Sequence, residues 1–166
     1  MTKKIVAFIL GITFAGNVMA QSETTEALQK KYDAQAFFFY NNTLRMLNQK
    51  NDASFDELIK DVEKMKFLMI KKTTADLDYK RVVGDYKNES FEEMMSSRHE
   101  GKNFDVFIKE KNNKTTGMLV LINDSTNLLV MDIVGSIALN NVTKLFQTLD
   151  DSADLGKKIR EFTGVE

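Results

Sequence analysis

The side chains of this sequence that could act as a nucleophile and a base are few and lie close together. His99 is the only histidine, and Ser96 and Ser97 precede it in the same short segment. In a serine nucleophile site, the serine and the histidine come from separate elements that converge on a pocket. Neighbours at a strand end or hairpin tip do not converge in this way, and no nucleophile elbow surrounds either serine. We therefore predict that His99 is an exposed turn residue and that the chain has no catalytic residue.

Ligands for a metal ion or a cofactor are equally scarce. One His and no Cys exclude the common zinc sites. Residues 123–127 read Asn-Asp-Ser-Thr-Asn and offer alternate oxygen atoms that could contact calcium. They lack the Gly and the distal Glu of an EF-hand loop, however, and Asn, Asp and Ser are typical of turns. We predict a turn at this segment, no metal site and no cofactor.

Two pairs of adjacent acids, Asp56-Glu57 and Glu92-Glu93, have the side chains of a general acid and base. Neighbouring side chains point about 100° apart on a helix and to opposite faces of a strand, so neither pair converges on a substrate by itself. The Gly residues also form no phosphate-binding loop. The sequence therefore predicts a protein that is not an enzyme.

The first twenty residues are typical of a secretory signal peptide. Lys3 and Lys4 form a positive start, an apolar run follows to Val18, and the segment ends with Val18-Met19-Ala20. Val18 and Ala20 place small side chains at positions −3 and −1 of a cut before Gln21. The run is too short for a membrane span, so we predict cleavage between Ala20 and Gln21 and a periplasmic or secreted protein that is not an integral membrane protein.

Composition limits the partners of the remaining domain. Removal of Lys3 and Lys4 lowers the 23 basic side chains to 21, against 24 acidic ones. No basic surface is expected to hold a polyanion, which argues against nucleic acid as a partner. The chain has no Cys, so packing must stabilise the fold without disulfides. It also lacks the Cys that directly follows the cleavage site in a bacterial lipoprotein.

The N-terminal half predicts short helices around one strand. Residues 22–32 read as a helix with Glu23 and Glu26 in its first turn, where the helix dipole favours acids. The aromatic run at residues 36–40 has strand length, although its spacing also allows the helix to continue. We favour a buried strand there, followed by a helix from about Asn42 to Asn48.

The middle of the chain carries two further helix signals. Ser54 and Glu57 fit a capping box, which predicts a helix from Ser54 to about Lys66 and then a strand at residues 67–70. Residues 76–83 predict another helix that ends at Gly84. A strand is expected at residues 91–98.

Three apolar segments of strand length, at residues 104–109, 117–122 and 128–134, give the clearest structural signal. Polar, Asn-rich segments separate them as hairpin turns do. The second and third are apolar on both faces, as central strands are. Gly135 is expected to end the sheet, and Asn140 to cap a last helix whose apolar face is Val142, Leu145, Phe146 and Leu149.

These elements predict an α+β fold: a single antiparallel-dominated sheet with a C-terminal β-meander, packed with helices. The expected organisation is a signal peptide at residues 1–20, one domain at residues 21–149 and a polar C-terminal extension at residues 150–166.

The order of elements resembles a known family. The segment Phe91-Glu92-Glu93-Met94-Met95 and a strand that runs from Val130 into Gly135-Ser136-Ile137 are similar to those of the small exported Bacteroidetes proteins grouped as domain of unknown function 4252. The resemblance covers roughly residues 22–149. It implies export and the α+β layout, and it implies no activity, ligand or catalytic residue.

The leading hypothesis is therefore an exported, non-enzymatic envelope protein that acts as a protein-interaction or structural module. Its surface of contact is expected on an exposed face of the sheet or of an amphipathic helix. The alternative is a periplasmic carrier of a small apolar ligand or lipid, because two strands are apolar on both faces and seven Met residues lie after residue 20.

Overall fold

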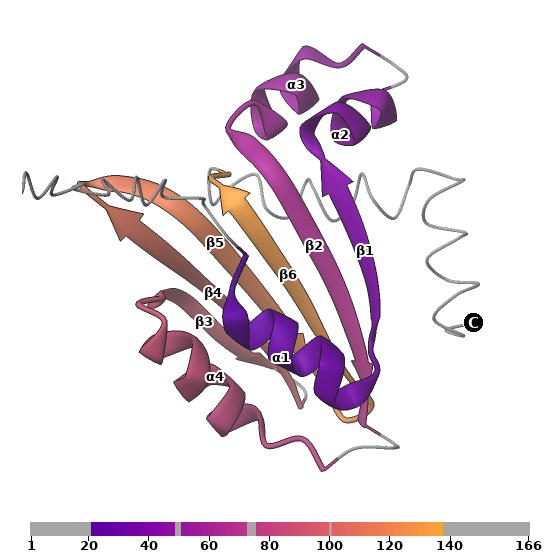
Figure 1. Cartoon of the computed structure of the whole chain (residues 1–166), viewed down its shortest axis with the longest axis vertical. Helices are drawn as coiled ribbons and strands as arrows, with labels where there is room; N and C mark the ends of the chain where they lie inside the picture. The colour runs from indigo at the N-terminus through magenta and orange to yellow at the C-terminus, as the bar shows by residue number, and fades with distance from the viewer. Residues whose placement is uncertain (1–20, 49–50, 73–75, 100, 138–166) are drawn as a thin grey trace, which may run out of the picture.

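The central feature of the computed structural model is a six-stranded antiparallel sheet with the order β1-β2-β6-β5-β4-β3 (Figure 1). The structure describes residues 21–48, 51–72, 76–99 and 101–137. The strands are β1 (Gln35–Tyr40), β2 (Val62–Lys71), β3 (Glu92–His99), β4 (Lys102–Lys111), β5 (Lys114–Asn123) and β6 (Asn127–Gly135). The helices are α1 (Glu23–Tyr32), α2 (Asn41–Leu47), α3 (Ala53–Ile59) and α4 (Tyr79–Asn88). The predicted α+β class, with strands β3 to β6 as a C-terminal meander, is confirmed.

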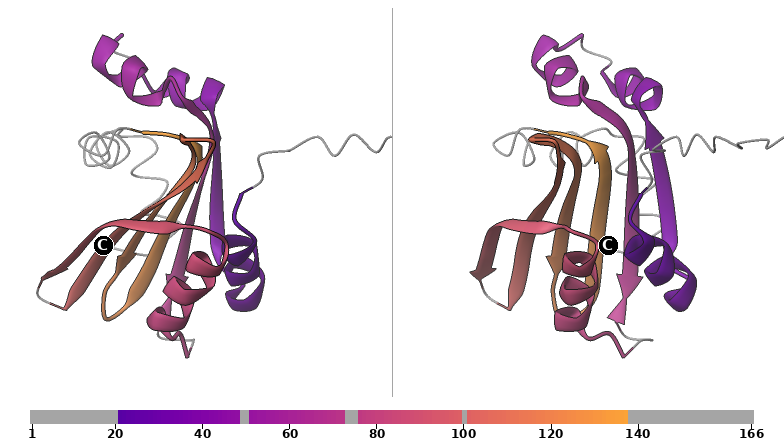
Figure 2. Two further views of the ribbon diagram at one scale, coloured as in Figure 1. Left: turned by 90° about the vertical axis from the view of Figure 1, so that its left-hand side faces the viewer. Right: turned by 60° about the vertical axis from the view of Figure 1, so that its left-hand side comes forward.

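Both faces of the sheet carry apolar side chains. Helices α1 and α4 lie side by side on one face, which we call the helix face, where Leu28 and Val82 pack on the sheet. On the other face, Phe55 and Leu58 of α3 and Leu44 of α2 belong to a second cluster. Figure 2 shows α2 and α3 beyond one end of the sheet, next to β1 and β2. Strands β5 and β6 occupy the centre of the sheet, as their apolar character on both faces predicts.

The aromatic run at residues 36–40 is a strand, as favoured from the sequence, but the prediction that it is buried is wrong: it lies at the edge of the sheet, where Phe38 and Tyr40 are exposed. All of β1 pairs with β2, and Phe37 lies opposite Phe67 in the register. The next helix, α2, agrees with the prediction to within one residue at each end. Tight turns join β4 to β5 and β5 to β6, and Asn112 and Asn113 adopt positive φ angles between β4 and β5, as Asn tolerates.

The predicted capping box at Ser54 is wrong. Asp52 is the N-cap of α3, and its side chain accepts a hydrogen bond from the backbone N–H of Ser54. The helix ends at Ile59, so Val62 and Met65, which lie within the helix predicted to extend to about Lys66, belong to β2. The reason is tertiary: β2 pairs along its length with β6 and with β1, and those ladders outweigh a weak local helical pattern.

The predicted helix end at Gly84 is also wrong. Asp78 caps α4 through the N–H groups of Lys80 and Arg81, and the helix continues through Gly84 to Asn88. Tyr86 is fully buried on the helix face, and its packing outweighs the roughly 1 kcal/mol that an interior Gly costs a helix. Ser90, with φ of 68°, supplies the left-handed residue after the helix.

Three expectations fall outside the described residues. They are the signal peptide at residues 1–20, the helix that begins at Asn140 and the polar extension at residues 150–166.

Candidate functional site

The structure does not bring the sequence-predicted candidates for nucleophilic chemistry together. His99 is exposed and is the last residue of β3, next to the turn into β4, as expected. Ser96 and Ser97 are consecutive residues of the same strand, so their side chains point to opposite faces of the sheet. Ser96 lies opposite Asp105 in the register and donates a hydrogen bond to its carboxylate, whereas Ser97 points to the other face.

The segment at residues 123–127 is a turn, as predicted. Asp124 Oδ1 accepts hydrogen bonds from Thr126 N at 2.7 Å, Thr126 Oγ1 at 2.8 Å and Asn127 N at 2.7 Å. Partial burial acts to raise the pKa of Asp124, but these hydrogen bonds outweigh it and hold the pKa below its ordinary value. The carboxylate therefore closes the turn.

The adjacent acids serve surface ion pairs. Glu57 pairs with Lys60 one helical turn later, and Glu93 Oε2 lies 2.9 Å from Lys87 Nζ. Among the described residues, no group of three or more His, Cys, Asp or Glu side chains could hold a metal ion. Within the same ranges, no helix is long and apolar enough to cross a membrane.

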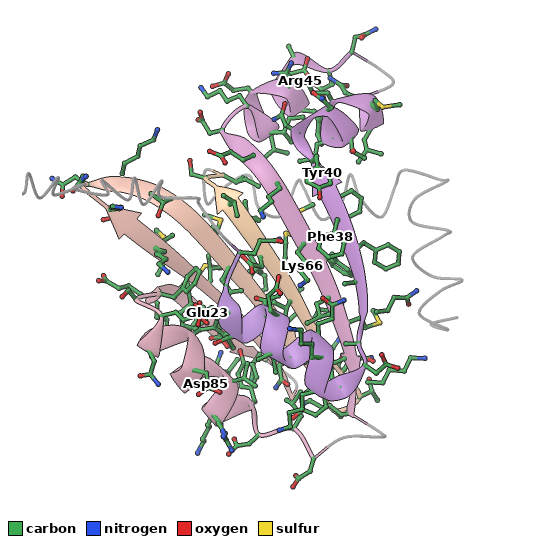
Figure 3. The ribbon with its side chains drawn as sticks, in the orientation of Figure 1. Glu23, Phe38, Tyr40, Arg45, Lys66 and Asp85 are labelled. Atoms are coloured by element: carbon green, nitrogen blue, oxygen red, sulfur yellow. The ribbon has the colours of Figure 1, made fainter. Side chains whose placement is uncertain are left out.

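A groove of about 620 Å³ lies between α1 and α4. Its floor includes Leu28 and Val82, and Glu23 and Asp85 lie on either side of it (Figure 3). Its charged residues are mostly acids. The acids are Glu23, Asp76, Asp78, Asp85 and Glu89, and the bases are Lys31 and Arg81.

One of these acids, Glu89, holds the first turn of α1 in place. Its carboxylate accepts hydrogen bonds from Ser22 Oγ at 3.0 Å, Glu23 N at 3.1 Å and Thr24 N at 2.6 Å. Ser22 is the N-cap of α1 and accepts from Thr25 N at 3.2 Å. The carboxylate thus satisfies helix N–H groups that have no partner within the helix, and its charge matches the helix dipole.

Below this turn, two charged side chains are buried in the sheet. Asp132 on β6 and Lys66 on β2 are each 1% exposed and lie opposite each other in the register, on the helix face. Asp132 Oδ2 accepts from Ser22 N at 2.9 Å, and Lys66 Nζ lies 3.7 Å from Glu26 Oε1 and 5.2 Å from the centre of the Phe38 ring. Burial raises the pKa of Asp132, although hydrogen bonds from Thr25 and Ser22 and the charge of Lys66 oppose the change.

A second buried acid lies nearer the other edge of the sheet. Asp105 on β4 is 1% exposed and accepts hydrogen bonds from Tyr79 Oη of α4 and from the Arg98 guanidinium of β3. Burial acts to raise the pKa of Asp105, but the bonds from Arg98, Tyr79 and Ser96 outweigh it, so the pKa lies below its ordinary value. Burial and the bond to Asp105 raise the pKa of Tyr79. The cluster therefore fixes α4 and β3 to the sheet.

Sequence reasoning missed both buried acids. Asp105 alternates with apolar residues along its strand, as a solvent-facing side chain does, and Asp132 lies within an otherwise apolar segment. The signal that could have found Asp132 is its position: a single acid inside an otherwise apolar central strand needs partners from another element.

The two edges of the sheet differ in chemistry. Edge strand β1 reads Gln-Ala-Phe-Phe-Phe-Tyr, and Phe38 and Tyr40 are 48% and 58% exposed. Figure 3 shows both side chains along this edge, with Lys66 inward on β2. The other edge strand, β3, contains Glu92, Glu93, Arg98 and His99 and has a register irregularity between Glu93 and Met95.

Comparison with known proteins gives one family. The family model described as a domain of unknown function, DUF4252, matches residues 22–145. No curated protein matches the chain, and no solved structure matches it. The matched range includes all of the strands and helices described above.

Proposed function

The chain belongs to the DUF4252 family, and we propose that it is an exported, non-enzymatic protein-interaction module that binds an extended segment of another envelope protein along edge strand β1. The observation that carries this proposal is the uncharged, aromatic and exposed character of that edge.

An edge strand directs half of its backbone N–H and C=O groups away from the sheet, where another strand can pair with them. Proteins usually prevent such pairing with charges, prolines or bulges on the edge. None of the six residues of β1 is charged or Pro, and its register with β2 is regular. Phe38 and Tyr40 share one face of β1, so a strand added there would gain apolar contacts at alternate positions.

The opposite edge supports the assignment by contrast. Every residue of β3 is exposed, and the strand carries both charges and a register irregularity, which are the usual protections of an edge. Since one edge is protected and the other is not, β1 is the edge suited to a partner. Its short length fits a linear segment better than a broad interface between folded domains.

Export is the second part of the proposal. It rests on the signal-peptide pattern of residues 1–20, with cleavage between Ala20 and Gln21. The released domain would act in the periplasm or outside the cell.

A non-enzymatic role is supported by how the buried polar groups are used. Asp105 and Glu89 each accept several hydrogen bonds from their own chain, and the exposed His99 lies at the end of an edge strand. The alternative, a carrier of an apolar ligand, gains no specific support, because charged residues surround the apolar floor of the groove between α1 and α4.

Site-specific photocrosslinking in the host cell tests the proposal. The photoreactive phenylalanine analogue p-benzoylphenylalanine is placed at Tyr40, where the side chain is 58% exposed, and in a matched control at Met94, which is 49% exposed on β3. We expect one defined crosslinked protein from position 40 and none from position 94. Mass spectrometry should place the crosslink in an extended, apolar segment of that protein.

A charge added to the same edge gives a second test. Tyr40→Lys should abolish the crosslink from an analogue at Phe38, whereas Met94→Lys should leave it unchanged. Equal crosslinking from both edges, a crosslink only to a second copy of the chain, or no effect of Tyr40→Lys would contradict the proposal. N-terminal sequencing of the host protein tests export separately, and retention of residues 1–20 would refute it.

A further inference from the structure

The polar cluster beneath the first turn of α1 contains more acids than bases. Asp132, Glu89 and Glu26 bring carboxylates to it, and Lys66 brings an ammonium group. The positive end of the helix dipole offsets part of this charge. The two fully buried charges, Asp132 and Lys66, balance each other, so the excess negative charge comes from the partly buried Glu89 and the half-exposed Glu26. A further cation beside Asp132 and Glu89 would offset this excess and stabilise the fold.

The backbone nitrogen of Gln21 lies close to this cluster. The next nitrogen along the chain, Ser22 N, donates to Asp132 Oδ2 at 2.9 Å. Consecutive backbone nitrogens are at most about 3.6 Å apart, so Gln21 N lies within about 6.5 Å of that carboxylate oxygen. An opposite charge at such a distance acts strongly on a buried acid.

Gln21 is itself docked on the domain. It is half-buried, and its side-chain Nε2 atom is buried without a hydrogen-bond partner among the residues that the structure describes. Ser22, immediately after it, is 3% exposed. The nitrogen of Gln21 is therefore held near the surface of the cluster by ordered neighbours.

We propose that the α-ammonium group created at Gln21 by removal of the signal peptide docks against Asp132 and Glu89 and supplies the missing positive charge of this cluster. The inference rests on the proposed cleavage after Ala20. In the precursor the same nitrogen belongs to a neutral peptide bond, so cleavage adds one charge where the folded domain lacks it. Processing then stabilises the mature fold.

The proposal also concerns the chemistry of an N-terminal glutamine. A neutral α-amine can attack its own side-chain carbonyl carbon: a bond forms from the amine nitrogen to Cδ, the bond from Cδ to Nε2 breaks, and ammonia leaves. The product is a lactam without the positive charge. A docked ammonium group has no free electron pair for this attack, so Gln21 should remain open in the folded protein.

The test uses chains with defined N-termini, released from a fusion by a protease that leaves no extra residue. One form begins at Gln21 and the other at Met19, which moves the ammonium group two residues away. Both are also made with Asp132→Asn and, as a matched control, with Asp85→Asn, an exposed acid of α4 outside the cluster. The Gln21 form should melt about 3 °C or more above the Met19 form near neutral pH.

The difference should disappear in the Asp132→Asn pair and persist in the Asp85→Asn pair. If Asp132→Asn does not fold, Glu89→Gln takes its place. The pKa of the Gln21 amine in the folded protein should lie above the usual value of about 7.7–8.0 for a terminal amine. The melting difference should therefore vanish as the pH rises through this raised pKa.

Equal melting of the two forms, a difference that survives Asp132→Asn and Glu89→Gln, or rapid loss of ammonia from Gln21 in the folded protein would overturn the proposal. These results are independent of the proposed partner, since crosslinking at Tyr40 reads out the interaction. They are also independent of export, which N-terminal sequencing of the host protein reads out.

Discussion

Lys66 and Asp132 face each other across β2 and β6, and both are almost completely buried beneath α1. Each has other partners as well: Lys66 lies near Glu26 and the Phe38 ring, and Asp132 accepts from Ser22 N. The pair therefore links the centre of the sheet to the first helix. The charge of Lys66 favours the ionised form of Asp132, but desolvation of the two buried groups offsets the attraction between them.

Removal of one partner of this pair should be more harmful than removal of both. Lys66→Met removes the buried positive charge that opposes the rise in the pKa of Asp132, and should lower the free energy of unfolding by about 1–3 kcal/mol. The double variant Lys66→Met with Asp132→Leu should lose less than the sum of the two single variants. Urea denaturation of the four proteins measures the coupling. Strictly additive losses would show that the two charges do not interact.

The second buried acid predicts the behaviour of the protein in acid. The pKa of Asp105 lies below its ordinary value, so its contribution to stability is complete above about pH 4 and is lost as the pH falls through the pKa in the folded state. Tyr79→Phe removes one donor to Asp105, and should bring the pKa back toward the ordinary value and lower stability at neutral pH by about 1–2 kcal/mol.

Acid unfolding monitored by circular dichroism checks this prediction. The Tyr79→Phe protein should begin to unfold at a higher pH than the unmodified protein. Tyr40→Phe, which removes the hydroxyl from an exposed tyrosine, is the matched control and should not move the curve. If the two variants have the same acid midpoint, the hydrogen bond from Tyr79 does not control the titration of Asp105.

The hairpins of the meander could be predicted because their signals are local. Asn-rich turns and apolar strands specify β4, β5 and β6 within a few residues of chain. The boundary between α3 and β2 could not be predicted. Residues 62–66 have a helix-compatible pattern and form a strand only by pairing with β1 and β6. The same limit applies to the polar clusters. Glu89 and Ser22 are far apart in sequence, and no local pattern indicates that one holds the other.

The two glycines Gly135 and Gly84 should respond in opposite ways to alanine. Gly135 has φ of +110°, and a Cβ atom there would lie 2.0 Å from the backbone oxygen of Asp61, so Gly135→Ala should cost at least about 2 kcal/mol. Gly84 lies inside α4 with no atom within 4 Å of an added Cβ, so Gly84→Ala should stabilise the protein by about 0.5–1 kcal/mol. Thermal unfolding of both variants gives the comparison. A neutral Gly135→Ala would mean that the end of β6 is not held against Asp61.

The face of the sheet opposite α1 and α4 provides the last prediction. Val106, Val120 and Ile133 on this face are almost completely buried, whereas among the described elements α2 and α3 lie beyond one end of the sheet, near β1 and β2. The chain continues from Ile137, which is 4% exposed and belongs to the same apolar cluster. The sequence predicts a helix from Asn140 with one apolar face, at the position in the chain where a cover for these strands would begin.

Two truncations separate this helix from the polar residues that follow it. A chain that ends at Ile137 should expose Val106, Val120 and Ile133, bind an apolar fluorescent dye and melt at a clearly lower temperature, because buried apolar area is the main stabilising term. A chain that ends at Leu149 keeps the apolar residues of the predicted helix and should have the same melting temperature as the domain that extends to Glu166. Melting curves and dye binding of the two proteins decide the matter. If the chain that ends at Ile137 is as stable as the one that ends at Leu149, residues 138–149 do not cover the sheet.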